Sequence, residues 1–72
     1  MHLRMGLILR MAKHGHVWHM LRPGQTKAIC FYHPRVWRYL RYDPPGKGVC
    51  KKCAIRYQHL IEEPEVGENR IN

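Results

Sequence analysis

The stretch that decides the fold is Val49-Cys50-Lys51-Lys52-Cys53-Ala54, in which two cysteines are separated by two residues. That spacing lets both sulfur atoms bind one metal ion. Residues 50–63 contain no proline or glycine, and Ala54, Tyr57 and Ile61 recur at helical spacing, which predicts a helix ended by Pro64. The sequence therefore predicts a helix that opens with two metal ligands.

The donor set predicts one structural zinc ion. Cys30 supplies a third sulfur beside Cys50 and Cys53, and the fourth ligand must be a histidine because the chain has only three cysteines. Zn²⁺ accepts sulfur and nitrogen donors in a tetrahedral site, and four protein ligands leave no position for a reactive water. Since no paired carboxylates, activated nucleophile or glycine-rich phosphate loop accompany these residues, we expect no enzyme activity.

The choice of histidine depends on a predicted β-hairpin. Residues 16–21 and 26–32 flank Pro23-Gly24, a pair typical of the centre of a type II turn. In that register His19 and Cys30 are diagonal neighbours on one face, which favours His19 as the fourth ligand. His33 is the main alternative because it forms Cys-x2-His with Cys30, and a one-residue slip in register would select His16 instead.

Charge is divided unevenly along the chain, whose formal net charge is +8 with a pI near 9.9. Residues 1–61 hold 12 of the 13 basic residues and one acid, Asp43. Arginines interleaved with aromatics, followed by lysines, favour DNA or RNA binding. The predicted nucleic-acid-binding residues are Arg35, Trp37, Arg38, Arg41, Lys47, Lys51, Lys52 and Arg56. The alternative partner is an acidic protein surface, because arginine, tryptophan and tyrosine also dominate protein interfaces.

The length of 72 residues allows one small domain with a thin core, which a metal ion would have to support. We expect a flexible apolar and basic extension at residues 1–12, a zinc-binding domain at 13–63 and a flexible acidic tail at 64–72. No stretch has the length of a membrane span or the form of a signal peptide, and three cysteines cannot all pair. A reducing, cytoplasmic location without membrane contact is therefore expected.

These features predict a small α+β zinc-stabilised domain, in which a β-hairpin is followed by a helix that begins with the Cys-x2-Cys pair. Residues 34–42 fit either a helix or a strand. The order of His19, Thr26-Lys27-Ala28-Ile29-Cys30 and Val49–Ala54 resembles the short His-Cys-Cys-Cys zinc-finger-like proteins of actinobacterial phages, within a treble-clef or zinc-ribbon-like class. Phe31 departs from that family, which usually has glycine after this cysteine. The resemblance covers residues 16–57 and implies a zinc module. The alternative function of this protein is that of an interaction module that docks on an acidic face of a larger complex, such as host transcription or translation machinery.

Overall fold

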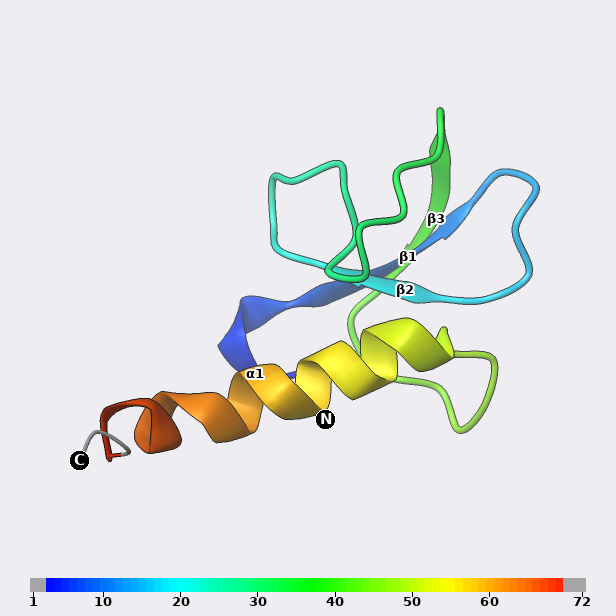
Figure 1. Ribbon diagram of the computed structural model, residues 1–72. Helices are drawn as coiled ribbons and strands as arrows, with labels where there is room; N and C mark the ends of the chain where they lie inside the picture. Colours follow the sequence, from blue (N-terminus) through cyan, green and yellow to red (C-terminus); the bar gives the residue numbers. More distant parts are fainter. Residues whose placement is uncertain (1–2, 70–72) are drawn as a thin grey trace.

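The computed structural model describes the backbone of residues 3–69 and the side chains of residues 3–62. Three antiparallel strands form one sheet in the order β2-β1-β3, and one long helix packs beside β2 (Figure 1). This arrangement is a small α+β fold, as the sequence predicts. In chain order the elements are the 3₁₀ turn η1 (Arg4–Gly6), β1 (Ile8–Ala12), β2 (His19–Leu21), β3 (Trp37–Arg41) and α1 (Lys51–Asn69).

The central strand comes from the N-terminal segment. β1 pairs with β2 on one side and with β3 on the other, so its backbone is bonded along both edges. Leu3, Leu7, Leu9 and Ala12 are buried, and Leu9 is completely inaccessible to solvent. The prediction of a flexible extension at residues 1–12 is therefore wrong for residues 3–12, while Met1 and His2 lie outside the described residues.

The antiparallel hairpin is formed by different strands from those predicted. β2 pairs with β1, so that Leu9 lies opposite Met20, whereas residues 26–32 form turns rather than a strand. The turn at Pro23-Gly24 is present, because the Gln25 N–H donates to the Arg22 carbonyl at 3.0 Å and Gly24 has a φ of 83°. Glycine suits this position because it adopts positive φ without a steric penalty.

Residues 37–41 adopt the strand alternative rather than the helix. β3 lies at the edge of the sheet against β1, with an irregularity in register between Met11 and Ala12. The guanidinium of Arg10 spans this pairing and donates to the carbonyls of Trp37 and Tyr39. The strand thereby carries Trp37 toward β2, where the candidate site lies.

The helix starts where the sequence predicts but ends later. α1 begins at Lys51 and continues past Pro64 to Asn69. The predicted helix end at Pro64 is therefore wrong, because proline removes one N–H donor and restricts its predecessor without forbidding helical backbone. The flexibility of the acidic segment 64–72 stays a prediction. Residues 70–72 lie outside the described residues. Within residues 3–69 no helix combines the length and the hydropathy of a membrane span.

One small core joins the sheet to the first turns of α1. Its centre is aliphatic, and its edge includes the fully buried Cys53 of the helix. Partly buried Tyr57 and Leu60 extend this contact along α1. Of the predicted metal ligands, Cys53 thus belongs to the core itself, and partly buried Cys30 and Cys50 pack against it. The buried members are Leu3, Leu7, Leu9, Met20, Leu21, Ala28, Ile29 and Cys53.

Candidate metal centre

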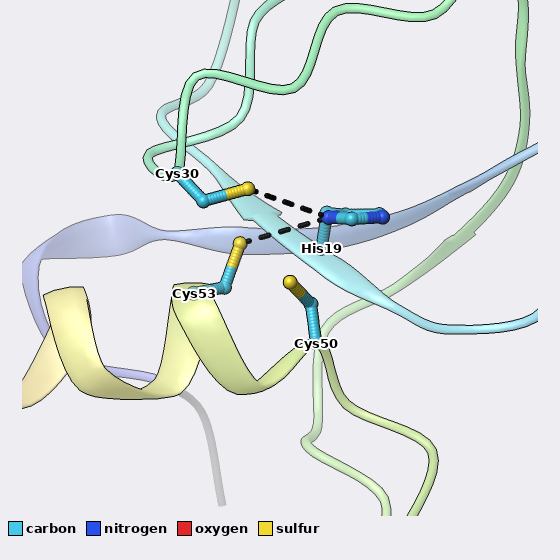
Figure 2. A group of neighbouring side chains, drawn as sticks. All are labelled: His19, Cys30, Cys50 and Cys53. Carbon is cyan, nitrogen blue, oxygen red and sulfur yellow. Dashed lines mark hydrogen bonds between the residues drawn. The ribbon is translucent and has the colours of Figure 1, made fainter.

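Four donor side chains from three parts of the fold meet at one point. His19 comes from β2, Cys30 from the loop after it, and Cys50 and Cys53 from the start of α1, and all four point toward a common centre (Figure 2). Their ligand atoms lie within 4.8 Å of one another. We call these residues the four-donor cluster. The cluster is close enough to hold a metal ion, and its members are the four residues favoured by the sequence.

A backbone bridge places Cys50 beside β2. Trp18, directly before β2, forms an isolated parallel bridge with Val49. The Trp18 N–H donates to the Gly48 carbonyl at 2.7 Å, and the Cys50 N–H donates to the Trp18 carbonyl at 2.8 Å. Gly48 has a φ of 85°, so the chain turns into this bridge at a position that favours glycine. The start of α1 is therefore tied directly to the strand that carries His19.

A tight loop presents Cys30. The Phe31 N–H donates to the Ala28 carbonyl at 2.8 Å, and the Ala28 N–H donates to the Tyr32 carbonyl at 2.9 Å. This pattern is typical of a three-residue hairpin loop in which a residue of positive φ follows the turn. Phe31 takes that position with a φ of 74°. For a residue other than glycine, the left-handed conformation costs about 1–2 kcal/mol.

Burial makes Cys53 a thiol that favours its neutral form in the absence of a cation. The pKa of the Cys53 thiol is raised to about 12, chiefly by burial and also by the neighbouring sulfurs of Cys30 and Cys50, while the hydrogen bond from Met20 acts in the opposite direction. The Met20 N–H lies 3.3 Å from the Cys53 sulfur, to which it donates. A bound cation supplies the positive charge that a buried thiolate needs, because a metal ion reverses the local preference for the neutral form.

His19 presents the chemistry and the spacing of a metal ligand. Burial lowers the pKa of His19 from its ordinary value, which favours the neutral imidazole that binds metals. Its Nδ1 lies 3.6 Å from the Cys30 sulfur and 3.8 Å from the Cys53 sulfur. A nitrogen and a sulfur bound at Zn–N of about 2.0 Å and Zn–S of about 2.3 Å are separated by about 3.5 Å in a tetrahedron. The distances from His19 to these two sulfurs are therefore compatible with a tetrahedral zinc ion.

Two aromatic rings cover the outer side of His19. Tyr32 stacks on the imidazole with ring centroids 4.5 Å apart, and Trp37 meets it edge-on at 5.8 Å. The Trp37 indole N–H donates to the Thr26 carbonyl at 2.7 Å, which anchors the ring. These contacts hold the orientation of His19 and limit the access of water to it.

The other two histidines considered as ligands lie elsewhere. His16 and His33 are exposed and belong to no metal-ligating group among the described residues. His33 follows the Cys30 loop, but it is His19 of β2 that faces the three sulfurs. The geometry therefore selects the first of the three histidines.

The predicted nucleic-acid-binding residues come from β3 and the residues before it, from the loop before α1, and from α1 itself. Arg41 lies over the Trp18 ring at 5.6 Å, and Arg38 lies over the Tyr39 ring at 5.8 Å. Half-buried Trp37 packs against the candidate metal centre, so its ring has a structural contact. Arg35, Lys47, Lys51 and Lys52 are exposed. Their role in binding nucleic acid stays a prediction.

One group of residues in this region escaped the sequence analysis. The exposed Phe31 ring lies 5.6 Å from the Lys27 ammonium and 5.4 Å from the Arg56 guanidinium. Exposed contacts of this kind contribute about 0.5–1 kcal/mol each. Of these three residues, only Arg56 was predicted to bind a ligand. The available signal was an aromatic residue directly after a predicted metal ligand, between two basic segments.

No family model, curated protein or solved structure matches this chain. The resemblance to phage zinc-finger-like proteins therefore stays a prediction, and the candidate function rests on the geometry and chemistry of the chain itself.

Proposed function

We propose that this protein is a small zinc module in which one structural Zn²⁺ organises the fold and an exposed basic surface binds nucleic acid. The observation that supports it most directly is the meeting of one imidazole and three thiols within 4.8 Å in a domain with a very small core. Structural zinc sites contribute about 10–16 kcal/mol of apparent binding free energy at neutral pH, which is folding free energy in such domains.

The proposed role of the metal is structural, not catalytic. Four protein ligands fill a tetrahedral zinc shell, so no position is left for a water molecule that could be activated. The three cysteines are free thiols. This state suits a reducing compartment, and the cytoplasm is therefore the proposed location.

The charge of the described surface supports the nucleic-acid partner. Residues 3–62 carry twelve lysines and arginines against two acids, and every basic side chain except Arg10 is exposed. Such an excess attracts polyanions and favours binding through phosphate contacts with the release of counterions. Exposed aromatic rings next to several of these cations add surfaces on which bases can stack.

The metal part of this proposal is tested by zinc content. We expect one zinc ion per chain by elemental analysis, with loss of the ion and of the folded structure after Cys53→Ala or after treatment with excess chelator. His19→Ala weakens zinc binding, whereas the matched controls His16→Ala and His33→Ala leave it unchanged. A chain that stays folded without metal in excess chelator would contradict the proposal.

The binding part is tested by titrating labelled DNA and RNA with the zinc-loaded protein at several salt concentrations. We expect binding at ~50 mM salt that weakens linearly on a plot of log affinity against log salt, because counterion release drives the association. Absence of binding to both nucleic acids at ~50 mM salt would exclude this partner.

A protein partner is the second candidate, and the outer edge of the sheet favours it. β3 lies at the edge, and its neighbourhood exposes Val36, Tyr39, Leu40 and Tyr42 to solvent. Exposed apolar side chains beside arginines are typical of protein-binding surfaces. An acidic protein surface would then replace nucleic acid as the ligand of the basic module, and the titration described above separates the two.

A further inference from the structure

We propose that Phe31, with the cations around it, forms a binding site for one unpaired nucleotide, in which the base stacks on the Phe31 ring and the flanking phosphates bind Arg22, Lys27 and Arg56. The inference rests on the proposed function and makes it more specific, because it assigns a preference for single-stranded nucleic acid. The inference also places the contact with the base between α1 and residues 22–31, away from β3.

The site is a hollow between the Pro23-Gly24 turn, the Cys30 loop and α1. Its volume is about 150 Å³, smaller than the roughly 300–1,000 Å³ of pockets that enclose a whole small molecule. The hollow therefore suits one flat group, with the remainder of the ligand outside. We call it the Phe31 hollow; its lining consists of Arg22, Gln25, Lys27, Ala28, Ile29, Phe31, Arg56 and Leu60.

The lining has the chemistry of a nucleotide site. Three cations surround the hollow, Gln25 offers an amide donor and acceptor, and the floor of Ala28 and Ile29 is buried and apolar. Phosphates attract the cations, whereas a base can use the aromatic ring and the apolar floor. Among the side chains of residues 3–62, no acidic one lines the hollow.

The Phe31 ring is not explained by packing. It is 64% exposed, and its backbone holds the left-handed conformation that favours glycine. The Cys30 loop requires that conformation, but it does not require a large aromatic side chain there. A strained and exposed aromatic residue at the rim of a cationic hollow indicates that the ring contacts a ligand.

The cations beside the ring are able to change partners. Lys27 and Arg56 lie near Phe31 through long, flexible and exposed side chains. Charge-assisted hydrogen bonds to phosphate are stronger than exposed contacts with an aromatic ring. When a nucleotide binds, these cations turn to its phosphates and leave a face of the ring to the base.

The decisive variant is Phe31→Gly. Glycine accepts a φ of 74° without strain, so we expect zinc content and melting temperature to be equal to or higher than those of the original protein. We expect affinity for a fluorescent oligothymidylate of about 12 nucleotides to fall by about fivefold or more, since stacking on one aromatic residue contributes that much. Affinity for a duplex stays unchanged, because its bases are already stacked.

Two further measurements separate stacking from charge. Phe31→Tyr keeps a ring of similar size, so it retains the affinity for the oligothymidylate. Phe31→Gly leaves the salt dependence of binding unchanged because it removes no charge, whereas Lys27→Ala reduces the slope by about 0.7 for a single strand.

The outcomes distinguish this inference from the proposed function. If the original protein binds the oligothymidylate and Phe31→Gly binds it equally well, the Phe31 site is excluded while nucleic-acid binding stands. If the original protein binds neither the oligothymidylate nor the duplex, nor RNA, at ~50 mM salt, the nucleic-acid-binding part of the proposed function fails, and this inference fails with it. Equal losses of affinity for the duplex and the single strand would also overturn the assignment to an unpaired base.

Discussion

At the scale of single residues, the orientation of the His19 ring depends on two neighbours that are not themselves metal ligands. Tyr32 stacks on its ring, and Trp37 meets it edge-on while donating to the Thr26 carbonyl. A ligand whose ring is held in place loses less rotational freedom on binding a metal than a free surface histidine does. The two aromatics thus prepare His19 for coordination.

Trp37→Phe tests the anchor of this arrangement. The substitution keeps an aromatic ring but removes the N–H that donates to Thr26, so we expect the zinc-loaded protein to lose about 1 kcal/mol of unfolding free energy. Chemical denaturation measures the loss. Tyr39→Phe, which removes the hydroxyl of an exposed ring on the same strand, is the matched control and should change stability by less than about 0.5 kcal/mol. Equal stability of the two variants would contradict an anchoring role for the Trp37 indole.

The donors of the candidate site could be predicted because their chemistry is visible in the sequence. The spacing of Cys50 and Cys53 indicates their role, and Cys30 follows as the third ligand because the chain has no other cysteine. His19 was selected through a hairpin that the structure does not contain, yet one hydrogen bond from the Ile29 N–H to the Met20 carbonyl brings the same two segments together. The positive φ of Phe31 could not be predicted, because it arises from the loop and not from the residue type.

At the scale of secondary structure, β1 was the element that the sequence concealed. Ile8, Leu9, Arg10, Met11 and Ala12 show no clean alternation, and the burial of the strand is equally irregular. β1 is paired along both edges, and all five of its residues are buried or partly buried. The Arg10 side chain is partly buried because its guanidinium donates hydrogen bonds to two carbonyls of β3. Alternation of apolar and polar residues identifies a strand that has one face in the core and one face in solvent, and β1 is not such a strand.

Leu9→Ala tests whether β1 is the centre of the fold. Leu9 is 0% exposed, so the truncation leaves a cavity and should cost about 2–5 kcal/mol of unfolding free energy in the zinc-loaded protein. The matched control is Leu40→Ala on β3, where the side chain is 45% exposed and the cost should be about 0.5 kcal/mol or less. Thermal or chemical denaturation that gave the two variants the same stability would contradict the central position of β1.

At the scale of the whole molecule, the aliphatic core and the four-donor cluster form one continuous structure. Cys53 belongs to both, and Tyr57 extends the link by accepting a hydrogen bond from the Arg4 backbone at 3.0 Å. The N-terminal segment and the helix therefore support each other across nearly the full length of the chain. Loss of either is expected to release the metal.

Two truncations test this dependence. A chain that starts at Met11 lacks Leu3, Leu7 and Leu9, so we expect it to lose its fold and most of its zinc affinity even though it keeps all four donors. A chain that ends at Glu62 keeps the described core and the donors, and should bind one zinc ion like the full protein. Circular dichroism and elemental analysis check both results. Full helicity and one zinc ion in the chain that starts at Met11 would contradict a structural role for the first ten residues.

The pairing of β1 also has a consequence for how the protein is made. The ribosome synthesises β1 before its neighbour β3 and before the start of α1, which carries Cys50 and Cys53. Until then β1 can pair only with β2, and the thiol of Cys30 lacks the neighbouring thiols of Cys50 and Cys53. The sheet and the four-donor cluster are therefore completed only once β3 and the start of α1 have been synthesised, so the binding of a metal ion belongs to the late steps of folding.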